Sequence, residues 1–212
     1  MMDIVTALEK QRSKIRMTVN EERVFMVPLS LFRERPYKLG EALDADEYDS
    51  WLMVRQFRHA MDRAGTYLSG RDRSAKELER LLLRCGYLES TVEMVILKLK
   101  KLKYINDDAF AASWVQSRSH KALGKRRIEQ ELRQKGVSKE AAREALEQLD
   151  GKQLQEKADE VAVKLARKYE NEEPRKALQK LMQALVRRGF DWDEARSAAQ
   201  KALTNDAEES LE

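Results

Sequence analysis

Residues 104–118 read YINDDAFAASWVQSR, and residues 124–137 read GKRRIEQELRQKGV. In the first stretch Phe110 and Trp114 lie four positions apart, and the second stretch spaces an isoleucine and a leucine in the same way. Side chains four residues apart share one face of an α-helix. Both stretches therefore predict short amphipathic helices whose apolar residues lie in a core.

The two stretches belong to a pattern that occurs three times. Gly86, Gly136 and Gly189 are 50 and 53 residues apart, and apolar residues recur at fixed offsets from each. Before the glycine, the residues are Leu78, Ile128 and Leu181 at eight positions, and Leu82, Leu132 and Leu185 at four positions. After the glycine, they are Tyr87, Val137 and Phe190 at one position, Val92, Ala142 and Ala195 at six positions, and Leu99, Leu149 and Ala202 at thirteen positions. The period predicts a three-helix module used three times, although coincidental matches within one compact helical bundle are the alternative.

Helix-end signals support long helices after residue 44. Acids three residues beyond an N-cap residue predict capping boxes at Asp44 and Glu47, Ser74 and Glu77, Ser90 and Glu93, and Asp191 and Glu194. Pro174 is expected in a first helical turn. Left-handed helix stops are predicted at Gly70, Gly86, Gly124, Gly136 and Gly189. One buried stripe is predicted along the first long helix, at Trp51, Val54, Phe57, Met61, Ala64 and Leu68.

The N-terminal segment follows a different pattern. Residues 13–19 alternate apolar and polar side chains, and residues 24–27 are apolar, so a β-hairpin is predicted with its turn at residues 20–22. A short helix is expected after Ser30 and before Pro36, and Gly40 should break the chain again.

These signals predict a mainly α fold of tandem three-helix repeats in an elongated, curved array, with a small N-terminal β-hairpin region. We expect the hairpin and short-helix extension at residues 1–43, repeats at 44–104, 105–150 and 151–203, and an acidic tail at 204–212. The charged fraction of 37% supports a solvent-rich shape, because the usual charged fraction is about 25%.

Composition also limits the functional classes. The single cysteine excludes an internal disulfide and suits a reducing cytosol. The N-terminus lacks the apolar core of a signal peptide, and no apolar run has the length of a membrane span. We therefore expect a cytoplasmic protein without a membrane partner.

No catalytic constellation stands out. His59, His120 and Cys85 do not form a metal-ligand pattern, and the Gly124–Lys125 pair lacks the leading glycine and the hydroxyl of a phosphate loop. We predict a chain that is not an enzyme and holds neither a cofactor nor a metal.

Positive charge gathers in the middle of the chain. The net charge is +4 overall. Within residues 116–139, eight basic side chains against two acidic ones give +6, and within residues 71–103 nine against five give +4. Such a band can neutralise phosphates or meet an acidic protein surface. A solvated helix face without a partner is the plainer interpretation.

The two opening stretches resemble the hallmark of the RecX family of recombinase regulators. They match its pattern of a tyrosine and paired acids before phenylalanine, tryptophan and arginine, then a glycine-bounded helix, almost throughout. Residues 71–87, RDRSAKELERLLLRCGY, resemble the family too, and the third repeat does so more loosely. The hairpin before residue 44 resembles an extension of longer members only weakly.

The resemblance implies a monomeric cytoplasmic protein that lies in the helical groove of a RecA filament on single-stranded DNA and inhibits its ATP hydrolysis and strand exchange. It also implies a setting of DNA repair, homologous recombination and the SOS response. The candidate contact residues are Arg118, Lys121, Lys125, Arg126, Arg127, Arg133 and Lys135. Arg118 and Lys135 belong to the family pattern, whereas the others rest on charge, and an ion pair of Arg118 with Asp107 or Asp108 is an alternative. A basic module that binds nucleic acid without a recombinase is the competing function.

Overall fold

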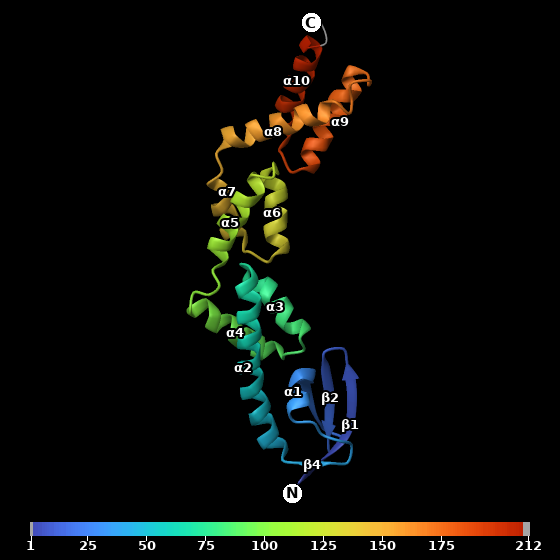
Figure 1. Ribbon diagram of the computed structural model, residues 1–212, viewed down its shortest axis with the longest axis vertical. Helices are drawn as coiled ribbons and strands as arrows, with labels where there is room; N and C mark the ends of the chain where they lie inside the picture. The colour runs from blue at the N-terminus through green and yellow to red at the C-terminus, as the bar shows by residue number, and fades with distance from the viewer. Residues whose placement is uncertain (1, 210–212) are drawn as a thin grey trace. The chain divides into compact units, whose positions relative to one another are not determined.

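The computed structural model describes residues 2–209, with side chains through residue 204. Helices predominate, and a small antiparallel sheet lies near the N-terminus (Figure 1). The chain divides into two compact units, residues 1–106 and 107–212. Three successive three-helix modules follow the sheet, which confirms the predicted fold class of tandem helical repeats.

The sheet contains four strands in the order β3-β2-β1-β4. They are β1 Asp3–Gln11, β2 Lys14–Val19, β3 Arg23–Pro28 and β4 Ala42–Leu43. The predicted hairpin is confirmed as β2 and β3, whereas the sequence analysis missed β1 and β4. A register shift between Val5 and Ala7 interrupts the alternation of β1, and Val5 is the one fully buried side chain in that strand. The alternation of apolar and polar side chains that predicts a strand was therefore too weak in β1.

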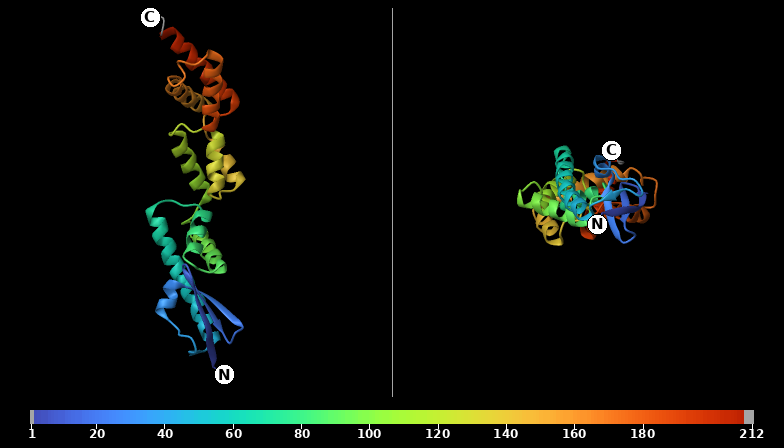
Figure 2. Two further views of the ribbon diagram at one scale, coloured as in Figure 1. Left: turned by 90° about the vertical axis from the view of Figure 1, so that its right-hand side faces the viewer. Right: turned by 90° about the horizontal axis from the view of Figure 1, so that it is seen from below.

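Two helices cover the sheet. Helix α1 Leu29–Glu34 occupies the position of the predicted short helix, and the first half of α2 Ala45–Gly70 adds Tyr48 and Leu52 to the same core. Met17, Phe25 and other apolar residues of β2 and β3 fill this core from the sheet side. Figures 1 and 2 show α2 extending from this region into the first repeat.

The second half of α2 forms the first repeat with α3 Ala75–Arg84 and α4 Glu89–Lys101. The predicted stripe of α2 is partly wrong, because Val54 is 68% exposed. The buried positions advance in steps of four, at Tyr48, Leu52, Gln56, Ala60 and Ala64. The predicted stripe includes the buried Ala64 but omits Tyr48, Leu52, Gln56 and Ala60.

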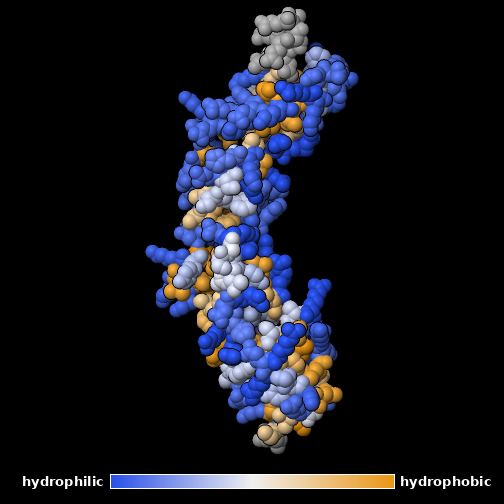
Figure 3. Space-filling view, in the orientation of Figure 1, coloured by the Kyte–Doolittle hydropathy of each residue, from blue (hydrophilic) through white to orange (hydrophobic). Residues whose placement is uncertain are grey.

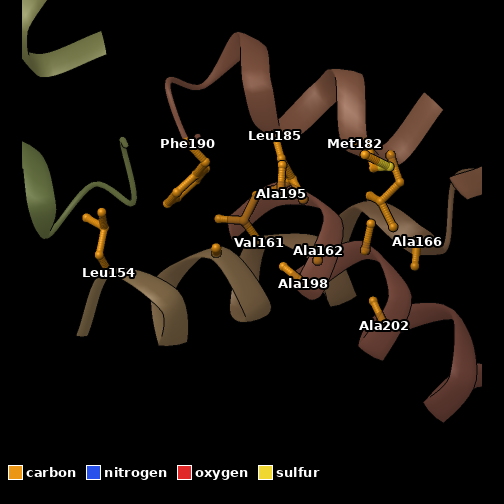
Figure 4. Packing of buried hydrophobic residues seen from close by; sticks show 13 residues of the cluster. Leu154, Val161, Ala162, Ala166, Met182, Leu185, Phe190, Ala195, Ala198 and Ala202 are labelled. Carbon is orange, nitrogen blue, oxygen red and sulfur yellow. The ribbon is translucent and has the colours of Figure 1, made fainter. Parts of the chain in front are cut away.

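The second unit contains two repeats. Its helices are α5 Asp107–Ser119, α6 Lys125–Gln134, α7 Lys139–Glu147, α8 Gly151–Ala166, α9 Pro174–Arg187 and α10 Trp192–Glu209. Figure 4 shows how α8, α9 and α10 enclose Leu185, Phe190, Ala195 and their neighbours. The apolar residues predicted at repeat offsets are buried throughout, except Leu149, which is partly buried and packs against both cores of this unit.

Most predicted N-caps are confirmed. Asp44 and Ser74 accept backbone hydrogen bonds from the first helical turns, and Pro174 begins α9. Asp191 and Glu194 form a complete capping box, with reciprocal bonds of 2.9 and 2.8 Å. The box predicted at Ser90 and Glu93 is wrong, because the N-cap of α4 is Leu88 and the helix begins two residues earlier than predicted, at Glu89. The buried Gln56 side chain accepts the Leu88 amide at 3.1 Å and so fixes that start.

Three of the five predicted glycine stops are confirmed. Gly86, Gly136 and Gly189 have φ angles of 92°, 76° and 92°. Gly70 is instead the last residue of α2, without a left-handed backbone, and Gly124 is the N-cap of α6 with φ of −75°. Both predictions of a left-handed stop at these two positions are therefore wrong.

Gly124 is needed for a close approach of two backbones. Its amide donates to the carbonyl of Arg188 at 3.1 Å, and the Arg126 amide donates to Gly189 at the same distance. A Cβ atom at Gly124 would lie 2.2 Å from the Gly189 carbonyl, and one at Gly189 would lie 2.3 Å from the Arg127 Cβ. The second and third repeats thus contact one another through backbone groups, and we call this contact between residues 124–126 and 188–189 the joint.

The end of the chain differs from the predicted boundary. Helix α10 continues to Glu209, so it includes most of the segment predicted as an acidic tail at residues 204–212. Residues 210–212 of that prediction lie outside the described residues.

Substituting Gly124 should test the joint. Gly124→Ala is expected to lower the free energy of unfolding by about 1–3 kcal/mol, because backbone atoms of the third repeat must shift to admit the methyl group. Urea denaturation of the whole chain measures this change. Gly151→Ala is the matched control, because Gly151 starts α8 and nothing lies within 4 Å of a Cβ there. Equal stability of both variants would contradict the close approach.

Candidate functional site

The predicted contact residues lie on and beside α6. Lys121 precedes the helix, three cations occupy its first turn, Arg133 lies in its last turn and Lys135 is its C-cap. The side chains of Lys121, Arg126, Arg127 and Arg133 are exposed, whereas those of Arg118, Lys125 and Lys135 are partly buried. The structure therefore separates the predicted residues into an exposed set and a set that packs within the repeat.

Arg118 and Lys135 enclose the indole of Trp114. The Arg118 guanidinium carbon and the Lys135 Nζ each lie 4.0 Å from the centroid of that ring. Glu131 accepts hydrogen bonds from Arg118 Nε at 2.7 Å and from Trp114 Nε1 at 3.1 Å. Phe110 stacks on Trp114 with the ring centroids 5.8 Å apart. This cluster links α5 to α6 and gives the two family-pattern cations a packing role.

Arg118 forms its ion pair with an acid other than the two that the sequence suggested. Arg118 pairs with Glu131, not with Asp107 or Asp108, because the side chain crosses to α6 instead of turning back along α5. The two side chains are only 20% and 18% exposed. A pair so shielded from water is worth more than a surface pair, and loss of one partner leaves a costly unpaired charge.

Unpaired positive charge gathers at the joint between the second and third repeats. Lys125 and Arg126 begin α6, and the backbone bonds of the joint place Arg188 next to them, with Arg187 preceding it. None of these four side chains forms an ion pair within the part of the chain that the structure describes. Arg127 adds a fifth cation, whose one ion pair within the described residues is a long contact of 3.7 Å with Glu131, beside a hydrogen bond of 3.4 Å to Gln130 Oε1. We call these five residues the joint cluster.

Nearby acids are already engaged. Glu194 belongs to the capping box of α10, and burial raises the pKa of its carboxyl, while the positive charges of Lys125 and Arg126 act against that rise. Asp191 caps the same helix. The visible face of residues 107–204 is mostly hydrophilic (Figure 3). The joint cluster therefore has the charge and exposure to hold a polyanion or an acidic protein surface.

Sequence reasoning missed Arg187 and Arg188. The predicted band ended at residue 139, and these two arginines lie in the third repeat. The repeat alignment already placed them directly before Gly189. It did not show that this glycine turn contacts the start of α6, since that contact requires the packing of whole repeats.

The described residues offer no candidate metal site and no membrane-spanning helix. Among their histidine, cysteine and acidic side chains, no group of three could hold a metal ion. No helix in the described part of the chain combines the length and the apolar character needed to cross a membrane.

Three family models match the chain, one for each repeat. Residues 60–99 match the first three-helix domain of RecX, residues 106–146 the second and residues 152–199 the third. The chain belongs to the RecX family. The regulatory protein RecX of Clostridioides difficile is 30% identical, over 97% of this chain and 98% of its own length. That of Streptococcus gordonii is 29% identical over 98% of this chain and 80% of its own length.

Two solved RecX structures have a fold similar to that of this chain. The crystal structure of a regulatory protein RecX superposes with a TM-score of 0.68 at 26% identity, over 94% of this chain and 99% of that one. RecX from Lactobacillus salivarius gives a TM-score of 0.65 at 29% identity, over 70% of this chain and 97% of its own. The three tandem three-helix domains are thus a property of the family.

Changing two arginines of the same repeat should separate packing from surface charge. Arg118→Ala is expected to lower the free energy of unfolding by about 1–3 kcal/mol, because it leaves the largely buried Glu131 with only its longer 3.7 Å contact to Arg127 as an ion pair. Arg126→Ala, the matched control, should leave stability within about 0.5 kcal/mol, since its side chain is exposed and unpaired. Urea denaturation measures both, and a stable Arg118→Ala variant would show that the cluster around Trp114 is dispensable.

Proposed function

We propose that this RecX-family regulator binds the RecA filament on single-stranded DNA, in the helical groove of the filament, and lowers its ATP hydrolysis and strand exchange. The joint cluster carries the proposal, because it places five cations on a surface shared by two family domains. The charge of this surface does not favour the helix that carries it. Three cations in the first turn of α6 oppose the helix dipole, and no acid occupies that turn.

Tandem repeats suit a partner that is itself repetitive. Each three-helix domain presents a small surface, and domains linked in one chain bind neighbouring filament subunits at a high effective concentration. Modest contacts at each domain then add to a tight complex without one large interface. We propose that the protein acts in this way as a cytoplasmic monomer.

The predicted contact residues take different parts in this proposal. Lys121, Lys125, Arg126, Arg127 and Arg133 supply charge to the partner, together with Arg187 and Arg188. Arg118 and Lys135 act by holding Trp114, and so by fixing the angle between α5 and α6. Charges on an exposed surface mainly speed encounter and set specificity.

Nucleic-acid binding without a recombinase is the second candidate. Lys125, Arg126, Arg187 and Arg188 form no ion pair with the side chains that the structure describes, and this favours the second candidate because phosphates can serve as their counter-charges. The two functions differ in salt response. Binding to bare single strands should weaken by about 0.7 log units per log unit of salt for each phosphate contact. Binding to the filament should survive at salt concentrations that abolish binding to bare DNA.

Charge reversal at the joint should remove the regulation. ATP hydrolysis by a preformed RecA filament on single-stranded DNA is expected to fall progressively when sub-stoichiometric amounts of this protein are added. The double variant Arg126→Glu, Arg127→Glu should need at least about tenfold more protein for the same fall, since two attractive charges become repulsive.

The matched control is Arg167→Glu with Lys168→Glu. These adjacent, exposed cations follow α8 in the same unit and lie away from the joint. This control should inhibit like the parental protein. An unchanged ATPase rate with parental protein at one copy per recombinase subunit would refute the proposed function.

A further inference from the structure

A second group of unpaired cations lies in the N-terminal unit, at the turn between β1 and β2. This turn and the C-terminal end of α3 border an open cleft of about 840 Å³. Its lining residues are Gln11, Arg12, Ser13, Lys14, Leu83 and Arg84. Three of the six are cationic and none is acidic. We call this feature the hairpin cleft.

The hairpin cleft is held together by backbone contacts. Gly86 follows α3 with φ of 92°, and a Cβ atom there would lie 2.7 Å from the Ser13 carbonyl oxygen. The same carbonyl accepts the Leu29 amide at 2.9 Å. The hairpin turn is thus seated against the end of α3. That seating brings Arg12 and Arg84 together, although 72 positions separate them in the sequence.

The turn itself uses an unfavourable residue. Arg12 has φ of 46°, in the left-handed region where residues other than glycine, asparagine and aspartate are uncommon. Two-residue hairpin turns favour pairs such as Asn-Gly, which adopt this backbone with less strain. Glu21, Lys103 and Ala122 also have positive φ angles, so this backbone shows a tight turn at Arg12 and does not by itself mark a functional position. Arg12 is exposed and forms no ion pair, so the described contacts give no stability reason for it.

The other two cations are also without counter-charges. Neither Lys14 nor Arg84 forms an ion pair with any residue of the described chain. Arg84 Nε makes one long bond of 3.4 Å to the Arg80 carbonyl, and its place in the last turn of α3 is favoured by the helix dipole. A local reason therefore exists for Arg84 but not for Arg12 and Lys14.

We propose that the hairpin cleft binds the phosphodiester backbone of a single-stranded nucleic acid. Guanidinium groups match phosphate oxygens in a bidentate manner, and an open cleft admits a continuous chain. A protein partner fits less well, because Leu83 is the one apolar residue in the lining, and protein interfaces have an apolar core.

A comparison with the joint cluster favours a polymeric anion over a small anion as the ligand of the hairpin cleft. There too, cations directly before a glycine turn meet a basic segment, with Arg187 and Arg188 facing the first turn of α6. One chain thus presents unpaired cations at two glycine turns, at Gly86 and Gly189. Repeated cationic points suit a ligand whose charges repeat along its length.

The test uses the full chain and a fluorescein-labelled oligothymidine, without recombinase, followed by fluorescence anisotropy at several salt concentrations. The variant Arg12→Glu with Arg84→Glu should bind at least about fivefold more weakly. Its salt slope should be smaller by about 0.7 for each lost phosphate contact. Arg33→Glu with Lys38→Glu changes the same charge on exposed residues of the same unit outside the cleft. That control should keep the parental affinity and slope.

Two results of the binding assay, and one of the filament assay, would overturn the proposal. One is parental binding by the cleft variant, and the other is an equal loss in both double variants, which would indicate a general charge effect. A variant that binds oligothymidine normally but no longer lowers filament ATPase would assign the cleft to protein contact and also overturn it, while leaving the proposed function standing. Urea denaturation confirms that both variants fold, and Lys14→Gln provides a milder test that leaves the turn unchanged.

Discussion

The direct contact between the backbones at Gly124 and Gly189 is the constraint on which the second unit depends. The first amides of α6 and the last carbonyls of α9 have no partners within their own helices. At the joint these groups satisfy one another, through the bonds from Gly124 to Arg188 and from Arg126 to Gly189. The two glycines serve different needs. Gly189 supplies a left-handed backbone, whereas Gly124, with an ordinary φ angle, supplies space.

The same contact explains how cations are tolerated at the start of α6. Positive side chains in a first turn are normally unfavourable, because the amide end of a helix carries partial positive charge. The carbonyl end of α9 faces that turn and contributes partial negative charge. The joint thus offsets part of the repulsion among Lys125, Arg126 and Arg127 while bringing Arg187 and Arg188 towards them. The structural joint and the charged surface are therefore made from one set of residues.

Much of this arrangement could be predicted from the sequence, and the limits have physical causes. Local signals were enough for the repeat glycines at 86, 136 and 189, for the apolar residues at fixed offsets, and for the cap of α10 by Asp191 and Glu194. The failures involve contacts between segments far apart in sequence. Gly124 resembled a helix stop because its neighbour across the joint was unknown. Likewise, Gln56 sets the start of α4 from 32 positions away. Strand β1 was missed because its alternation is broken by a bulge.

In the candidate site, a count of charges does not distinguish cations that could bind a partner from cations that pack within the fold. Arg118 and Lys135 have the same formal charge as Arg126, yet each lies 4.0 Å from the centroid of the Trp114 ring, and Glu131 compensates Arg118 at 2.7 Å. A candidate binding cation is one that forms no ion pair within the described residues and lies beside cations from another segment of the chain. Lys125, Arg126, Arg187 and Arg188 meet this description in one unit, and Arg12, Lys14 and Arg84 meet it in the other. Lys125 and Lys14 are partly buried, whereas the other five are exposed. Both sets adjoin a glycine turn, at Gly189 and at Gly86, where the backbone of one segment closely approaches that of another and brings together charges from both.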